Sequence, residues 1–185
     1  LKMMAMASDE KNSMDFFKKV RIVPVSISYE YDPTDALKMP QLMAEANDEI
    51  YIKEKNEDFI TLLSGIIGQK KRIHIHVGDV LDAELDTISA ETTNSNKQMF
   101  ALAQVIDDSI LQSYKLWPTN YIAYDLLHKT NSNSDKYTEK EKQLFERRLE
   151  LRINADDAKM KESFLAMYAN PVINKLKYQK IESHS

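Results

Sequence analysis

Two histidines, His74 and His76, stand two positions apart in the apolar run 72–78 and are the first candidates for chemistry. Alternate residues of a strand point to the same face, so both imidazoles could reach one metal ion. Two ligands do not define a metal site, and no third ligand follows at a suitable spacing. We therefore favour a pair of half-exposed strand histidines over a histidine metal protein.

His74 and Asp79 also have a His-x4-Asp spacing, in which a histidine could act as general base on a hydroxyl while an aspartate orients it. Positions five apart in a strand face opposite ways, however, and the residues between the two belong to a strand end. No Gly-x-Ser-x-Gly turn supports a serine nucleophile either. The sequence therefore predicts no catalytic residues in this chain.

Composition excludes several other classes of protein. The 185 residues include no cysteine and only three glycines, so thiolate metal sites and glycine-rich phosphate loops are absent. The net charge of −4 gives no indication of nucleic acid as a partner. The basic clusters at 70–72 and 147–148 are more typical of a solvated face than of a phosphate site. No run of 18 apolar residues occurs, so any contact with a membrane would be peripheral.

The clearest strand covers residues 20–31, and its two faces differ in polarity. One face is apolar, with Val23, Val25, Ile27, Tyr29 and Tyr31, and the other is small and polar, with Pro24, Ser26, Ser28 and Glu30. Pro24 cannot donate a hydrogen bond to a neighbouring strand. It therefore marks an edge, a bulge or the point where pairing stops.

Helices dominate the rest of the chain. A second strand is expected at 72–78, with Ile73, Ile75 and Val77 on one face. Because two strands do not form a stable sheet alone, we expect their partners in a preceding part of a longer protein. The helix-like opening at 1–7, which has no capping residue before it, gives the same expectation. The helices are expected at 33–39 and 40–55, with Pro40 restarting the chain, then at 56–67, 98–114, 118–127, 138–153 and 157–169, and from Pro171 onward.

The segment Arg21-Ile-Val-Pro-Val-Ser-Ile-Ser-Tyr-Glu30 resembles the fourth conserved block of the glycerol-3-phosphate and 1-acylglycerol-3-phosphate acyltransferases. Downstream, Tyr51-Ile-Lys-Glu54 and Gly68-Gln-Lys70 resemble the next segment of that family. The strand at 72–81 is similar to the family's strand ending in Phe-Gly-Glu-Pro, with Val77, Asp79 and Val80 in place of Phe, Glu and Pro. The similarity covers about residues 1–85, and the helical remainder resembles no family that we can name.

The resemblance implies an α/β fold: residues 1–90 would form the C-terminal part of the acyltransferase α/β domain, and 91–185 a helical C-terminal extension. It also implies transfer of a fatty acyl group from acyl-CoA or acyl carrier protein to a glycerol-phosphate hydroxyl, without another cofactor. The family's catalytic and phosphate-binding blocks precede the matched strand, so this chain alone should be inactive. Its matched block is associated with the substrate and acyl-chain site, which assigns substrate binding to Pro24, Tyr29 and Glu30.

The resemblance further implies a cytoplasmic enzyme at the periphery of the inner membrane. The acyl acceptor, the donor and the oligomeric state cannot be read from the sequence. One alternative is a non-catalytic helical module that binds a partner protein or acyl carrier protein, which would also explain the missing catalytic blocks.

Overall fold

The computed structural model describes residues 1–7, 9–10 and 12–182, and the chain divides into two compact units. Unit 1 consists of residues 1–27 and 75–114, and unit 2 of residues 28–74 and 115–185. The fold is dominated by helices and has a small two-stranded antiparallel sheet, in agreement with the expected helix-rich α/β class. The predicted domain boundary at residue 90 lies within unit 1 and stays a prediction.

The sheet is a ribbon of β1 (Val25–Tyr29) and β2 (Ile73–Val77), which run from one unit into the other. The amide of Gly78 donates to the carbonyl of Pro24 at 2.9 Å, and the amide of Glu30 to that of Arg72 at 3.0 Å. These bonds fix the register, in which Ser26 lies opposite His76. Pro24 cannot return the bond from Gly78, so regular pairing ends there, as its position in the sequence predicted.

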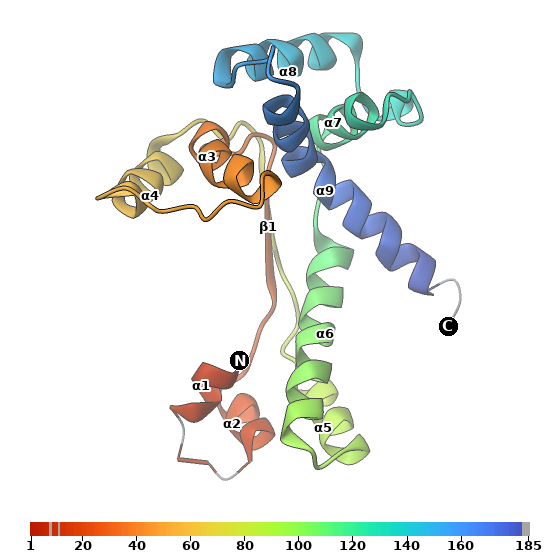
Figure 1. The fold of residues 1–185 in the computed structure, drawn as a ribbon. Coiled ribbons are helices and arrows are strands. Elements are labelled where there is room, and N and C mark those ends of the chain that lie inside the picture. Colours follow the sequence, from red (N-terminus) through yellow and green to blue (C-terminus); the bar gives the residue numbers. More distant parts are fainter. Residues whose placement is uncertain (8, 11, 183–185) are drawn as a thin grey trace. The chain divides into compact units, whose positions relative to one another are not determined.

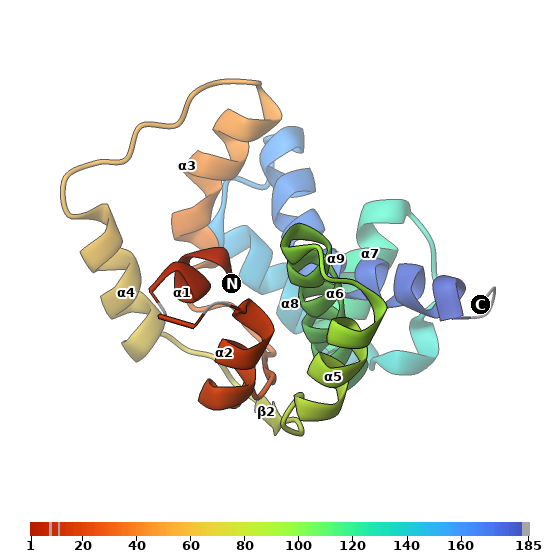
Figure 2. The ribbon, with the colours of Figure 1, turned by 90° about the horizontal axis from the view of Figure 1, so that it is seen from below.

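Unit 1 is a small helical cluster that surrounds its own core. Helices α5 and α6 pack on each other, and α2 packs against α5 (Figure 2). The helices of unit 1 are α1 (Lys2–Met6), α2 (Ser13–Val20), α5 (Asp82–Glu91) and α6 (Ser95–Ser113). The buried hydrophobic side chains of this core are Met14, Phe17, Leu81, Leu85, Ile88, Met99 and Leu102.

Unit 2 has a larger core around α9, which packs along α7 and also contacts α3 (Figure 1). Its elements are α3 (Asp35–Ala46), α4 (Glu57–Ile67), α7 (Pro118–His128), η1 (Ser134–Lys136), α8 (Glu139–Arg152) and α9 (Ala158–Glu182). Three aromatic rings pack against one another in tilted and edge-to-face arrangements, with centroids 5.2–6.2 Å apart; they belong to Phe145, Phe164 and Tyr168. No helix in the described part of the chain is both long enough and apolar enough to cross a bilayer.

The helix breaks predicted at two prolines are wrong. Pro40 lies inside α3 and Pro171 inside α9, so each of these helices is continuous. A proline removes one backbone hydrogen bond, but packing on both sides of it can outweigh that loss. In α3, Met39 and Ala44 are buried on either side of the exposed Pro40. Tertiary packing therefore decides helix length here.

Candidate functional site

The three predicted site residues do not converge on one point. Tyr29 lies on the exposed face of β1, with 37% of its surface accessible, whereas Pro24 and Glu30 are buried on the opposite face. Pro24 belongs to unit 1, and Tyr29 and Glu30 belong to unit 2. Their predicted role in substrate binding stays a prediction, and each residue has its own local environment.

Glu30 is held by two basic side chains from the start of β2. Its carboxylate accepts from Nε of Arg72 at 2.7 Å and from Nζ of Lys71 at 3.2 Å. Burial opposes ionisation of Glu30, but the bonds from Arg72 and Lys71 together lower its pKa below its usual range. The hydroxyl of Thr119 in α7 donates to the backbone carbonyl of Glu30 at 2.7 Å. Glu30 therefore fixes the end of β1 to β2.

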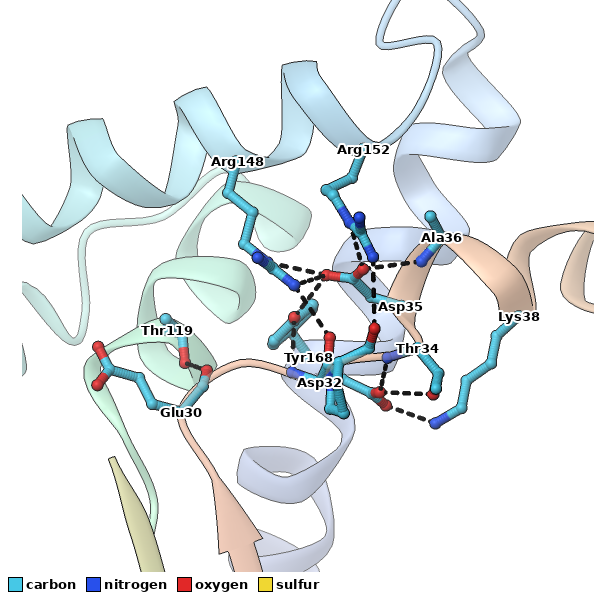
Figure 3. A network of polar contacts seen from close by, with 11 residues as sticks. Glu30, Asp32, Thr34, Asp35, Ala36, Lys38, Thr119, Arg148, Arg152 and Tyr168 are labelled. Atoms are coloured by element: carbon cyan, nitrogen blue, oxygen red, sulfur yellow. Dashed lines mark hydrogen bonds and ion pairs between the residues drawn. The ribbon is translucent and has the colours of Figure 1, made fainter. Parts of the chain in front are cut away.

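A denser polar network follows immediately in the sequence and is centred on the fully buried Asp35 (Figure 3). Arg148 donates to Oδ2 of Asp35 through Nε at 2.9 Å and forms an ion pair with it through Nη2 at 2.6 Å, and Arg152 donates to Oδ1 through Nε at 2.7 Å. The Tyr168 hydroxyl donates to Oδ2 at 2.9 Å, and the Ala36 amide donates to Oδ1 at 2.8 Å. Four hydrogen bonds and the ion pair with Nη2 of Arg148 thus saturate one carboxylate.

The same side chains also hold the loop between β1 and α3. Arg148 and Arg152 donate to the carbonyls of Asp32 and Pro33, and the Tyr168 hydroxyl accepts from the Asp32 amide at 3.0 Å. Burial and the negative charge of Asp35 raise the pKa of Tyr168, which therefore stays protonated. Every group in this network has a partner within the chain. The arrangement positions β1 and α3 and leaves no side chain poised as a general base or nucleophile.

A helix was predicted from residue 33, but Pro33 and Thr34 form a turn, and Asp32 caps no helix there. Its carboxylate accepts from the Thr34 amide at 2.8 Å and pairs with Lys38, and α3 begins at Asp35. Burial opposes ionisation of Asp32, but Lys38 and Thr34 lower its pKa. Asp32 therefore stabilises the turn that leads into the network.

The segment at 130–134, which has the composition of a linker, is ordered around Asp125 at the end of α7. The Asp125 carboxylate accepts from Asn133 Nδ2 at 2.9 Å, the Tyr137 hydroxyl at 2.9 Å and the Thr130 hydroxyl at 3.0 Å. Burial and the bond to Asp125 raise the pKa of Tyr137 to about 12. This second carboxylate has neutral donors only and fixes a loop.

His74 and His76 both lie on β2, and the described residues bring no third metal ligand to them. In the described ranges 1–7, 9–10 and 12–182, no three His, Asp or Glu side chains are grouped to hold a metal ion. Nδ1 of His74 is buried without a hydrogen-bond partner, whereas His76 is exposed. Asp79 is an exposed residue beyond the end of β2. Neither spacing found in the sequence therefore corresponds to an assembled site.

Sequence reasoning missed the Asp35 network, although one signal was available. Arg148 and Arg152 are four residues apart, so they lie on one face of α8, next to the buried Phe145 and Leu149. Two arginines beside a buried stripe require an acidic partner, because an unpaired buried charge is costly. The partner itself, Asp35, is 113 residues away from Arg148 and could not be identified from spacing.

Comparison with known proteins adds no family assignment: no family model, no curated protein and no solved structure matches this chain.

Proposed function

We propose that this chain is the C-terminal part of a glycerolipid acyltransferase. The parent enzyme would transfer a fatty acyl group from acyl-CoA or acyl carrier protein to glycerol-3-phosphate or 1-acylglycerol-3-phosphate. The proposal is supported by the three segments at 21–30, 51–70 and 72–81, which resemble that family in order and spacing. Its structural support is one observation, namely that the apolar face of the β1–β2 ribbon is uncovered.

That face, here called the apolar ribbon face, consists of Val25, Ile27, Tyr29, Ile73, Ile75 and Val77. The strand register makes these residues cross-strand neighbours, and each has between 37% and 65% of its surface exposed. On the polar face it is the β1 serines that are covered, with Ser26 and Ser28 at most 2% exposed. In an antiparallel sheet that leaves one face to water, the exposed face is normally the polar one and the apolar face is buried. The ribbon therefore has the surface of two strands from a larger sheet.

The three predicted residues receive distinct roles in this proposal. Tyr29 lies on the apolar ribbon face and would contact the acyl chain or the substrate. Glu30 would hold the strand end through Arg72 and Lys71, and Pro24 would stop the pairing where the chain enters the ribbon. We propose a cytoplasmic location at the periphery of the inner membrane, where the lipid acceptor and product lie.

An acyl-transfer assay tests the proposal. Radiolabelled acyl-CoA and acyl carrier protein are offered with glycerol-3-phosphate and with 1-acylglycerol-3-phosphate to two proteins. One is this 185-residue chain, and the other is the longest natural reading frame that contains it. We expect transfer by the longer protein alone. Transfer by the short chain, or by neither protein, would contradict the proposal.

A second candidate function follows from the same exposed face. The apolar ribbon face could bind a partner protein or acyl carrier protein in a module without catalysis, because large exposed apolar patches commonly mark interfaces. Absence of transfer from both proteins, together with retention of this chain on immobilised acyl carrier protein, would favour that function.

A further inference from the structure

Three polar atoms of unit 2 are buried without a hydrogen-bond partner in the part of the chain that the structure describes. They are Oγ of Ser28, Nδ1 of His74 and Nε1 of Trp117. Ser28 is 1% exposed and Trp117 is 5% exposed, so bulk water does not reach either group. Because buried polar atoms in folded proteins are nearly always paired, each of the three requires a partner.

Ser28 and His74 face each other across the two strands of the ribbon. The register that places Ser26 opposite His76 also pairs Ser28 with His74, on the polar side of the ribbon. The two residues of such a pair exchange backbone hydrogen bonds, and their Cα atoms are about 5.5 Å apart, the wider of the two antiparallel spacings. The serine side chain is short, so its hydroxyl lies near the imidazole without bonding to it.

The indole of Trp117 lies beside the same strands, directly before α7. The Cζ atom of Arg72 is 5.0 Å from the centroid of its ring, and Arg72 is the residue next to His74 on the polar side of β2. Two positions after the tryptophan, the Thr119 hydroxyl donates to the carbonyl of Glu30 at 2.7 Å (Figure 3). The beginning of α7 is therefore held against the end of the ribbon at which the unpaired atoms lie.

The three groups are complementary to a single water molecule. An indole N–H only donates, a hydroxyl both donates and accepts, and an imidazole nitrogen without a proton accepts. A water molecule that accepts from Trp117 and Ser28 and donates to His74 satisfies all of them at once. Buried waters in proteins typically make about three such bonds to groups that otherwise have none.

We propose that an internal water molecule binds between Ser28, His74 and Trp117 and joins both strands of the ribbon to the beginning of α7. Nδ1 of His74 is the acceptor in this arrangement, so the imidazole proton is on Nε2. The three residues belong to unit 2 and lie on the side of the ribbon opposite the apolar ribbon face. The inference does not depend on acyl transfer.

Cross-relaxation between water and the indole N–H tests the site by NMR on the ¹⁵N-labelled 185-residue chain. Trp117 is the only tryptophan, so its indole signal is identified without further assignment. We expect cross-peaks to water of opposite sign in laboratory-frame and rotating-frame Overhauser spectra, which is the signature of a long-lived bound water. Proton exchange with the solvent would instead give the same sign in both.

Two substitutions of Ser28 separate the water from the serine hydroxyl, whose proton also exchanges with the solvent. Ser28→Ala removes the hydroxyl and leaves room for the water, so the cross-peak should remain. Ser28→Val fills the space with methyl groups, so the cross-peak should be lost. The control is Ser134→Ala, at an exposed serine of η1 in the same unit, and it should leave the cross-peak unchanged.

The ¹⁵N shifts of the His74 imidazole at about pH 7.5, where imidazole is mostly neutral, give a second readout. Nδ1 should have the shift of an unprotonated nitrogen that accepts a hydrogen bond, and Nε2 that of a protonated nitrogen. The proposal is overturned by the absence of the cross-peak in the wild type, its loss in Ser28→Ala, its persistence in Ser28→Val, or a proton on Nδ1. Circular dichroism shows whether each variant is folded, and the wild type, Ser28→Ala and the His74 shifts decide if Ser28→Val is not.

Discussion

Asp35 is the residue whose loss should destabilise unit 2 most clearly. The substitution Asp35→Asn keeps the size of the side chain but removes the charge that Arg148 and Arg152 share. The Arg148 side chain is only 12% exposed, so its guanidinium would stay buried without a counter-charge. The new amide nitrogen would also face groups that are themselves donors, which leaves hydrogen bonds unmade.

The expected loss of unfolding free energy is about 3 kcal/mol. Removing one partner of a buried ion pair typically costs about 3–5 kcal/mol. The lower end applies here because the Arg152 side chain is 35% exposed and can turn to water. For a domain of this size, such a loss lowers the melting temperature by roughly 10 °C.

Urea unfolding followed by Trp117 emission measures this effect, because Trp117 is buried in unit 2. The matched control is Asp135→Asn, which breaks the exposed pair between Asp135 and Lys136 and should leave the midpoint unchanged. A loss below about 1 kcal/mol for Asp35→Asn would refute the reasoning, because it would mean that the network carries no net stability.

Four further substitutions have defined outcomes. Gly68→Ala should lower the stability of unit 2 by about 1–3 kcal/mol, since its methyl group would meet Pro33. Gly65→Ala has room for a methyl group and should be neutral or slightly stabilising. Thermal melts of both variants test this pair of predictions. Pro40→Ala should raise the unfolding free energy by about 1–3 kcal/mol, because Pro40 is exposed and interrupts the hydrogen bonds of α3. A lower unfolding free energy measured in urea would contradict this prediction. Folding lowers the pKa of Glu30, so the ionised carboxylate stabilises the folded state at pH values above its unfolded pKa. This stabilisation is lost as the pH falls through the lower pKa of the folded state. Glu30→Gln should therefore have a lower unfolding free energy than the wild type at neutral pH, and the difference should shrink between about pH 5 and pH 3. A difference that stays constant in urea titrations over that range would disprove this.

Local patterns predicted both strands and most helices, but they did not predict which faces are covered. The alternation of Val25, Ile27 and Tyr29 with serines identified β1 correctly, and the apolar stripe from Phe59 to Ile67 identified α4. Both elements have their apolar side outward, because the sides that pack within the units carry serines and glycines. Periodicity shows that two faces differ, whereas the residues that each face meets decide burial.

The polar networks were harder to predict than the elements. Asp35 meets Tyr168 across 133 positions of sequence, and no local spacing connects the two residues. The residues of the loop around Asp125 are small and polar, which is the composition of a linker. Composition alone does not show that those same groups converge on one buried carboxylate. Contacts at long sequence separation therefore account for most of what the sequence did not reveal.

The central claim is that the β1–β2 ribbon belongs to the larger sheet of an acyltransferase domain, with its apolar face in the interior. Amide hydrogen exchange of peptides covering residues 25–29 tests this most directly, because the amides of Val25, Ile27 and Tyr29 point away from β2. In the 185-residue chain these amides should exchange rapidly. In the longest natural reading frame they should be protected about a hundredfold or more, as sheet neighbours pair with β1. Equally rapid exchange in both proteins would contradict the claim.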